Sequence, residues 1–214
     1  MESNRVRVLI VAKTRMASFA CVGGLILDTN KSIRLLGSDG LNQPANTPFD
    51  VGQIWDVEFQ QPSKVDPPHV EDALVTKKRF LGQQSNVCET LLQRVHPWRG
   101  GPEQLFDSLL VIENTRCYIS RSKGIPNCST GYWLPNTPLT FNSNYKKQYY
   151  EIKHEFLARN RSFQTTLSIP YVGFAAPIPV IPADSLIRVS LARWWQSIEM
   201  SEERCYLQLS GWYL

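Results

Sequence analysis

Short segments in which apolar and polar side chains alternate are the feature that most constrains this fold. In VGQIWDVEFQ (51 to 60), Trp55, Val57 and Phe59 alternate with polar neighbours, which is typical of a half-buried strand. Similar segments span 5 to 12, 21 to 28, 32 to 37, 70 to 80, 115 to 120, 149 to 158, 163 to 174, 186 to 195 and 204 to 214. Loops rich in proline, glycine or polar residues separate them, so the sequence predicts barrels or sandwiches.

Two helical patterns interrupt these strands near the middle of the chain. SNVCETLLQRV (85 to 95) begins with a candidate Ser N-cap and places Val87, Leu91 and Val95 at helical spacing. A second pattern runs from Pro102, a suitable first-turn residue, to about Leu110. We therefore expect a mainly β protein with a first barrel-like unit over 1 to 82, a helical connector over 83 to 111 and a second barrel-like unit over 112 to 214.

The composition indicates which classes of protein this chain can belong to. With 43% hydrophobic and 20% charged residues, and no apolar run near the ~18 residues that span a bilayer, the chain is expected to be soluble and to lack a membrane partner. The N-terminus shows no signal-peptide cleavage pattern, which predicts a cytoplasmic protein. Five widely spaced cysteines and three histidines support neither a disulfide framework nor a metal site, so we expect buried free thiols, no metal and no cofactor.

Charge is unevenly distributed along the chain. Residues 1 to 107 hold 12 Lys/Arg and 12 Asp/Glu, whereas residues 108 to 214 hold 11 and 7, so the net charge of +4 comes from the second half. Between Arg116 and Arg161, eight basic residues accompany two acidic ones. Such asymmetry is compatible with a polyanionic partner and equally with a solvated loop surface.

Several motifs together resemble a known family. VLIVAKTRM, CVGG, IRLLGSDG, PPHVED, STGYW, YVGF, IRVSLARWW and RCYLQLSGWY occur in this order, and the chain resembles the dual OB-fold domain family of bacterial conflict systems over nearly its whole length. The resemblance implies two tandem OB-like β-barrels joined by a short helical segment. It also implies recognition of nucleic acid or a nucleotide within an anti-phage defence system, where other defence proteins are possible partners; it supplies no catalytic residues.

The last two strand segments provide candidate binding residues. Alternation places Ile187, Val189 and Leu191 on a core face of one segment, and Cys205, Leu207 and Leu209 on that of the other. If the two strands pair without a bulge, the opposite faces share Arg188, Trp194, Arg204, Tyr206 and Trp212. Arg and Trp side chains could stack on bases, or the Arg could cover the Trp as a purely stabilising cation–π partner.

Further cations lie at strand ends in the first half. Lys13 and Arg15 follow the first strand with two-residue spacing and could hold a phosphate, and Arg34 lies on a strand face with Leu36. Ordinary solvated surface groups are the alternative for all three. The expected nucleic-acid or nucleotide-binding residues are therefore Lys13, Arg15, Arg34, Arg188, Arg193, Trp194, Arg204 and Trp212.

Two other functions remain open. His69, Glu71 and Asp72 in PPHVED could form the acid–base centre of a hydrolase or nuclease. A protein–protein interaction scaffold would be favoured if Ile178 and Ile181 of the proline-rich loop AAPIPVIPADS were exposed. The chain has neither a GxxxxGK[ST] loop nor a GxSxG motif, so nucleotide hydrolysis by a P-loop and serine esterase chemistry have no support. A non-enzymatic recognition module is the expected function.

Overall fold

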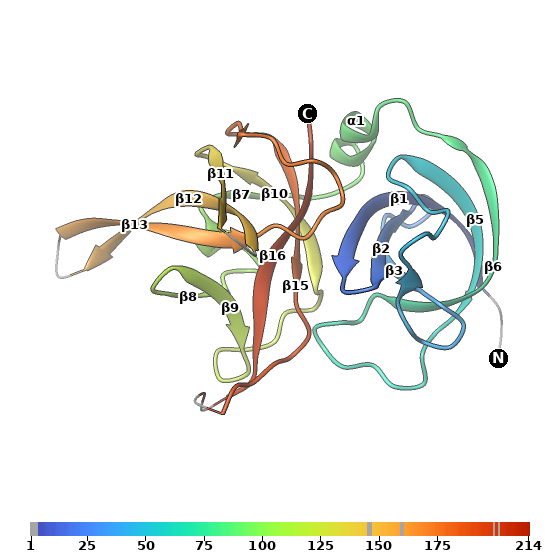
Figure 1. Ribbon diagram of the computed structural model, residues 1–214, viewed down its shortest axis with the longest axis horizontal. Helices are drawn as coiled ribbons and strands as arrows, with labels where there is room; N and C mark the ends of the chain where they lie inside the picture. The colour runs from blue at the N-terminus through green and yellow to red at the C-terminus, as the bar shows by residue number, and fades with distance from the viewer. Residues whose placement is uncertain (1–3, 145–146, 159–160, 199, 201) are drawn as a thin grey trace. The chain divides into compact units, whose positions relative to one another are not determined.

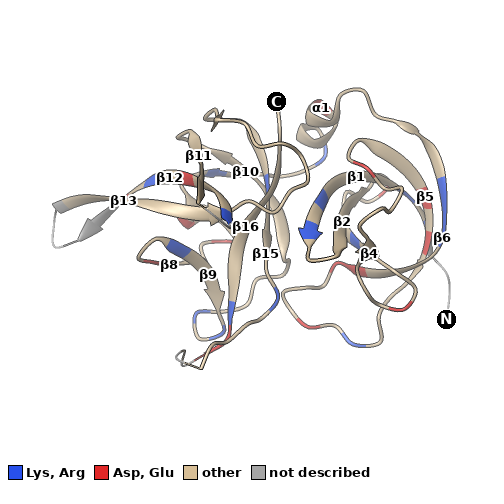
Figure 2. Ribbon diagram, viewed as in Figure 1, with Lys and Arg blue, Asp and Glu red and all other residues tan. Residues whose placement is uncertain are grey.

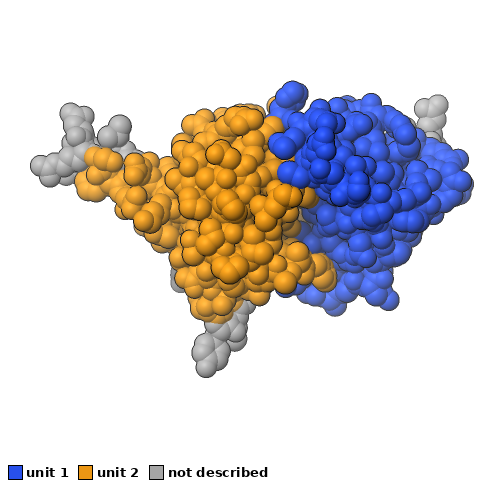
Figure 3. Space-filling view, turned by 90° about the horizontal axis from the view of Figure 1, so that it is seen from above, with its two compact units in different colours: residues 1–96 blue, residues 97–214 orange. Residues whose placement is uncertain are grey.

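The computed structural model describes residues 4–144, 147–158, 161–198, 200 and 202–214. The chain divides into two compact units, Met1–His96 and Pro97–Leu214, which Figure 3 distinguishes by colour. The described residues of unit 1 form six strands and one short helix: β1 (Asn4–Met16), β2 (Phe19–Ile26), β3 (Ser32–Leu36), β4 (Gln43–Pro44), β5 (Gln53–Gln60), β6 (Asp72–Gln83) and α1 (Val87–Leu92).

Unit 1 is a closed barrel. Its strands pair in the order β1-β5-β6-β3-β2-β4, and β1 also pairs with β2, so five strands form a ring (Figure 1). All of these pairs are antiparallel except β3 with β6, which is parallel. This five-stranded barrel is consistent with the OB fold expected from the family resemblance.

The barrel interior is formed by alternate side chains of each strand. Val8, Val22, Leu35 and Val57 are fully buried in one hydrophobic cluster. Gly24 allows β1 and β2 to approach closely, because a Cβ atom at this position would lie 2.3 Å from Cγ1 of Val8. The alternation seen in the sequence therefore identifies the core face of unit 1.

Unit 2 is a curled, partly open arrangement of two sheets. Its elements are β7 (Trp98–Gly100), the 3-10 helix η1 (Pro102–Gln104), β8 (Val111–Glu113), β9 (Arg116–Ser120), β10 (Thr130–Pro135), β11 (Leu139–Asn144), β12 (Lys147–Ala158), β13 (Arg161–Pro170), β14 (Val180–Ile181), β15 (Leu186–Leu191) and β16 (Arg204–Tyr213). One sheet has the order β7-β10-β15-β16-β9-β8, and the other has the order β13-β12-β11-β14. A single cluster of buried side chains that includes Trp133, Tyr150, Ile187 and Leu209 fills the space between them.

The helical connector is not confirmed. The first expected helix is present as α1, whose N-terminus is capped by Asn86 and not by Ser85. The second expected helix, from Pro102 to about Leu110, is present only as the short η1. It cannot continue further, because Phe106, Asp107 and Ser108 have φ angles of 53°, 57° and 64°, which a right-handed helix excludes. Two strands, β10 and β11, lie between the segments expected as strands over 115 to 120 and 149 to 158, where only a loop was expected.

Two expectations about burial can be compared with the structure. Cys117 and Cys205 are buried, whereas Cys21, Cys88 and Cys128 are half-buried. Ile181 is fully buried and Ile178 is partly buried against the core of unit 2. The condition that would have favoured a protein-binding scaffold, exposure of these two isoleucines, is therefore not met. Neither helix of the described residues is long and apolar enough to span a membrane.

Candidate functional site

Aromatic and arginine side chains gather on the outer face of β9 and β16. In β16, Cys205, Leu207 and Leu209 are buried, while Arg204, Tyr206 and Gln208 are half-buried on the opposite face. The antiparallel register places Tyr206 opposite Tyr118 and Arg204 opposite Ser120. Because side chains of paired residues lie on the same face of a sheet, this register brings the two tyrosines together.

Four side chains on this face, Tyr118, Trp195, Arg204 and Tyr206, form what we call the β9/β16 platform. The Arg204 guanidinium lies 4.0 Å from the centre of the Tyr118 ring. The ring centres of Tyr118 and Tyr206 are 5.7 Å apart, and those of Tyr206 and Trp195 are 6.2 Å apart. The platform is thus a continuous series of planar groups with one cation at one end.

The two ends of the platform differ in exposure. Tyr118 is only 4% exposed, and the Arg204 side chain that lies over it is 18% exposed. Trp195, at the other end, is 53% exposed. An exposed tryptophan ring packed on a partly buried tyrosine presents a flat, apolar surface to solvent, which is a suitable surface for stacking.

Backbone hydrogen bonds fix the position of Trp195. Strand β15 ends at Leu191, and the Ala192 N–H then donates to the Tyr206 carbonyl over 2.8 Å. Trp195 and Arg204 exchange two backbone hydrogen bonds of 3.1 and 2.9 Å. The alternation of β15 therefore ends at Leu191, and the pairing with Arg204 places Trp195 beside the platform residues.

Acidic side chains orient the arginine of the platform. Nη1 of Arg204 donates to Oε2 of Glu113 over 2.7 Å. Burial disfavours the charge on Arg204, but hydrogen bonds to Glu113 and Tyr206 outweigh this effect and raise the pKa of the guanidinium. Glu202 accepts a hydrogen bond of 2.7 Å from Ser120, which lowers the pKa of this carboxyl. The ion pair with Glu113 therefore helps to hold Arg204 over the Tyr118 ring.

Arg193 and Trp194 lie between Leu191 and the platform. Trp194 is half-buried and packs against the core of unit 2. The Arg121 guanidinium lies 4.1 Å from the Trp194 ring centre and donates through Nε to Glu203 over 3.2 Å. The cation–π alternative therefore describes Trp194, and it also describes Arg204 over Tyr118. Arg193 is exposed.

A β-bulge at Ser210 separates two residues that the sequence placed on one face. Val189 pairs with Leu209 and Arg188 pairs with Gly211, so Ser210 is the extra residue in β16. Beyond the bulge the faces are exchanged, and Trp212 packs on the core side with ring-centre distances of 5.6 Å to Tyr150 and 5.3 Å to Tyr171. The expectation that Trp212 shares the outer face with Arg204 is thus wrong. Arg188, which faces away from that core, is only 4% exposed.

The three candidate cations of unit 1 lie in different settings. Lys13 donates through Nζ to Asp50 over 2.8 Å and to the Thr47 carbonyl over 3.2 Å. Arg34 forms an ion pair with Asp72, the residue beside it in the parallel β3–β6 pair. Arg15 is exposed near the end of β1. Carboxylates in unit 1 therefore already neutralise Lys13 and Arg34.

The residues of the alternative hydrolase centre are all buried. His69, Glu71 and Asp72 are 1%, 9% and 8% exposed, and Asp72 is held by Arg34. A carboxylate in an ion pair with arginine is a weak general base, because the cation favours its deprotonated form and lowers its basicity.

Sequence reasoning missed Trp195, Tyr118 and Arg121. Alternation had placed Tyr206 on the outer face, but nothing in the sequence showed that Tyr118 pairs with it. Trp195 could have been found only by recognising that strand β15 ends four residues earlier. The signal for Arg121, a cation directly after a strand, is too common to be specific.

The fold and this face define the class of protein: a β protein with a five-stranded OB-type barrel in unit 1 and a curled, OB-like half-barrel in unit 2. A family model described as "Dual OB-containing domain" matches residues 6–212. The chain therefore belongs to the dual OB-containing domain family.

Other comparisons are less informative. No curated protein matches the chain. A solved structure of a murine DNA-binding protein bound to double-stranded DNA is similar at 11% identity and a TM-score of 0.31, over 98% of this chain and 93% of that chain. A likeness at this level supports no conclusion about either fold or function.

Proposed function

We propose that this protein binds single-stranded nucleic acid or a nucleotide without catalysing a reaction, and that the β9/β16 platform stacks on a base. The observation that carries the proposal is the exposed ring of Trp195, which packs on Tyr206 at the open end of the platform. Membership of the dual OB-containing domain family supports it, because OB folds bind oligonucleotides. Bases of any sequence offer a flat face, so this contact is expected to be tolerant of sequence.

Arg193 is the cation that this proposal assigns to a phosphate contact, because Arg204 is already paired with Glu113. Arg193 is exposed two residues before Trp195, and Arg204, the backbone partner of Trp195, lies over the Tyr118 ring. Of the residues expected from the sequence, Arg193 and Arg204 therefore remain in the proposed site, whereas Trp194 packs against the core of unit 2 under Arg121. Trp212 leaves it because its ring packs on the core side.

The test is the affinity of the full chain for fluorescent oligo-dT and oligo-U, measured by anisotropy. Because stacking contributes ~1 to 3 kcal/mol per base, Trp195→Ala should weaken binding by about 5- to 150-fold. Phe163→Ala is the matched control, because Phe163 is also an aromatic residue of unit 2 and is 46% exposed. Equal affinities for the wild type and Trp195→Ala would rule out the platform as the binding surface.

We further propose that the chain acts as the recognition part of a prokaryotic defence system together with other proteins. The support is the resemblance of its motifs to a family of conflict systems. In cells that carry the complete system, Trp195→Ala should raise the plating efficiency of phage towards that of cells without the system. Full protection by the variant would argue that binding at the platform is not needed for defence.

A further inference from the structure

Strand β6 extends well beyond its partner β3. The parallel pair of β3 and β6 covers only Asp72, Ala73 and Leu74 of β6, whereas the pair of β5 and β6 continues to Gln83 (Figure 1). Within the part of the chain that the structure describes, Thr76–Gln83 therefore has a strand neighbour on one side only. All residues from Thr76 to Leu81 are exposed.

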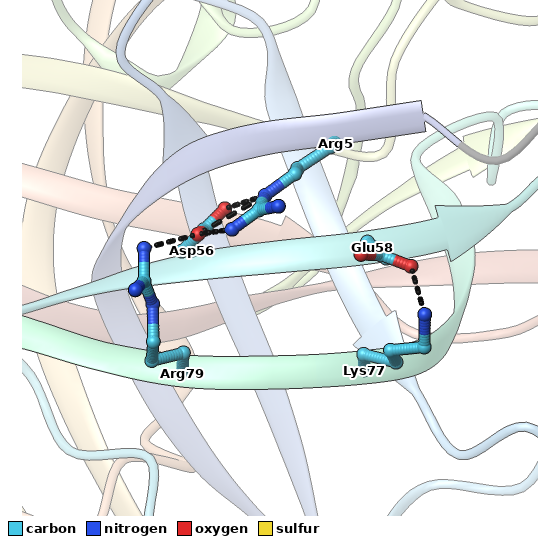
Figure 4. A network of polar contacts seen from close by, with 5 residues as sticks. All are labelled: Arg5, Asp56, Glu58, Lys77 and Arg79. Atoms are coloured by element: carbon cyan, nitrogen blue, oxygen red, sulfur yellow. Dashed lines mark hydrogen bonds and ion pairs between the residues drawn. The ribbon is translucent and has the colours of Figure 1, made fainter.

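The sequence of this extension, TKKRFLGQ, is basic, but two of its three cations are neutralised on the outer face. Lys77 pairs with Glu58 over 3.0 Å, and Arg79 pairs with Asp56 over 3.0 Å. Asp56 also accepts from Arg5 of β1, so the acidic side chains of β5 lie between cations of both neighbouring strands (Figures 2 and 4). These two cations therefore have little charge left for a further anion.

Lys78 lies on the opposite face and has a different environment. It is paired in register with Val57, a core residue of the barrel, and its Nζ lies 4.6 Å from the centre of the Phe49 ring. Among the described residues no carboxylate lies within ion-pair distance of Lys78. Partial desolvation of the Lys78 ammonium, with no counter-charge to offset it, lowers the pKa of Lys78. An anion placed here would gain a cation that no protein carboxylate already holds.

Phe80 lies two residues further along the same face and supplies a flat ring. It is 50% exposed and meets Trp55 edge-on, with ring centres 5.5 Å apart. Trp55 in turn packs edge-on against the buried Phe49 at 4.9 Å. The exposed Phe80 ring therefore packs on Trp55, which packs on the buried Phe49 ring. Lys78 lies over the same Phe49 ring.

We propose that Lys78 and Phe80 form a second nucleotide-binding site, located in unit 1, in which Phe80 stacks on a base and Lys78 contacts an adjacent phosphate. Residues two apart in a strand are separated by about 7 Å along the strand, which is close to the size of one nucleotide unit. This site rests on the proposed function, because it presumes that the ligand is a single-stranded nucleic acid. It differs from the β9/β16 platform in every residue.

An acidic peptide that adds a strand to the free edge of β6 is the competing occupant. A peptide of that kind would use the backbone of Thr76–Gln83 and the charge of Lys78, but it would not require the aromatic face of Phe80. The combination of one uncompensated cation and one exposed ring is the pattern that single-strand binders use for phosphate and base. The observations therefore favour the nucleotide.

Native mass spectrometry of the full chain with a short oligo-dT, too short to occupy two sites, tests the proposal. The wild type should bind two oligonucleotides, and Phe80→Leu, which keeps the apolar bulk but removes the ring, should bind one. Lys78→Ala should weaken the second site, whereas Lys77→Ala removes the same charge from the outer face and should leave both sites intact. Circular dichroism melting curves check that each variant is folded.

The outcomes separate this proposal from the proposed function. Loss of one oligonucleotide in Phe80→Leu and of the other in Trp195→Ala would support both sites. A wild type that binds a single oligonucleotide, lost in Trp195→Ala and retained in Phe80→Leu, would overturn the second site alone. Binding that Phe80→Leu abolishes and Trp195→Ala does not would overturn the platform and retain the second site. The remaining outcome is that a poly-glutamate peptide displaces the oligonucleotide and binds the wild type and Phe80→Leu with equal affinity. That result would assign the free edge of β6 to a protein partner and overturn the proposal.

Discussion

Asp56 is a residue whose ionisation the fold changes. It accepts hydrogen bonds from Arg5 and Arg79, and the bond from Arg5 makes the largest contribution to lowering the pKa of Asp56 to about 2. An aspartate in an unfolded chain has a pKa of about 3.9. The unfolded chain therefore binds the proton more readily, so the ion pairs stabilise the barrel above a pH of about 4, and that stabilisation is lost as the pH falls towards 2.

The corresponding prediction concerns Asp56→Asn. The variant should unfold at a lower urea concentration than the wild type near neutral pH, and the difference should shrink as the pH falls from about 4 to about 2, because the wild-type carboxyl then becomes neutral as well. Urea denaturation at several pH values measures this effect. A difference that stays constant down to the lowest pH would show that the substitution acts through packing and not through charge.

Strands β7 and β10 show how a single glycine determines the packing of an element. Trp98 on β7 lies directly over Gly131 on β10, and a Cβ atom at Gly131 would lie 2.2 Å from the Trp98 ring. The two strands form a parallel pair in which Trp133 is opposite Trp98. An alanine at this position can be accommodated only if the Trp98 ring or the strand moves.

Gly131→Ala should therefore destabilise unit 2 by about 1 to 3 kcal/mol, the usual effect of overpacking. Gly211→Ala is the matched control in the same sheet, because a Cβ at Gly211 has no atom within 4 Å. Guanidinium denaturation followed by tryptophan fluorescence reports mainly on unit 2, which contains five of the six tryptophans. Equal destabilisation by both substitutions would indicate a backbone effect and not the contact with Trp98.

At the scale of the whole molecule, the count of 23 Lys and Arg residues overstates the number of cations that are available to a polyanion. Arg5, Lys77 and Arg79 are paired with carboxylates, and so is Arg204 in the platform. We therefore expect few phosphate contacts, about two to four, and a shallow dependence of affinity on salt. With a slope of about −0.7 per contact for single strands, log K should fall with log salt with a slope of about −1.4 to −2.8.

The same measurement distinguishes stacking from charge. Trp195→Ala should reduce affinity at every salt concentration but leave the slope unchanged, because the indole is neutral. Lys78→Ala should reduce the magnitude of the slope by about 0.7, the contribution of one phosphate contact. Anisotropy titrations between about 50 and 200 mM salt cover the useful range. A slope near zero would contradict a role for phosphate contacts in binding.

Alternation was sufficient to predict most of the longer strands and the core faces of their regular parts. Ile187, Val189, Leu207 and Leu209 are buried as expected, because a period of two fixes which side chains share a face as long as a strand is regular. The segments that became β1, β2, β3, β5 and β6 were likewise visible in the sequence. Together with the family motifs, this local signal was enough to predict a mainly β protein with OB-type units.

The tertiary structure alone decided which side chains meet. The bulge at Ser210 moves the Trp212 side chain to the core face of β16. Because β15 ends at Leu191, the position of Trp195 no longer follows the alternation of that strand. Both features depend on how neighbouring strands pair. Lys78 differs from Lys77 and Arg79 because these two neighbours form ion pairs with carboxylates on the adjacent strand. The sequence by itself determined the strand faces, because side-chain alternation is a local property of the backbone. The candidate sites depended on register and on partners distant in the sequence, which local patterns do not specify.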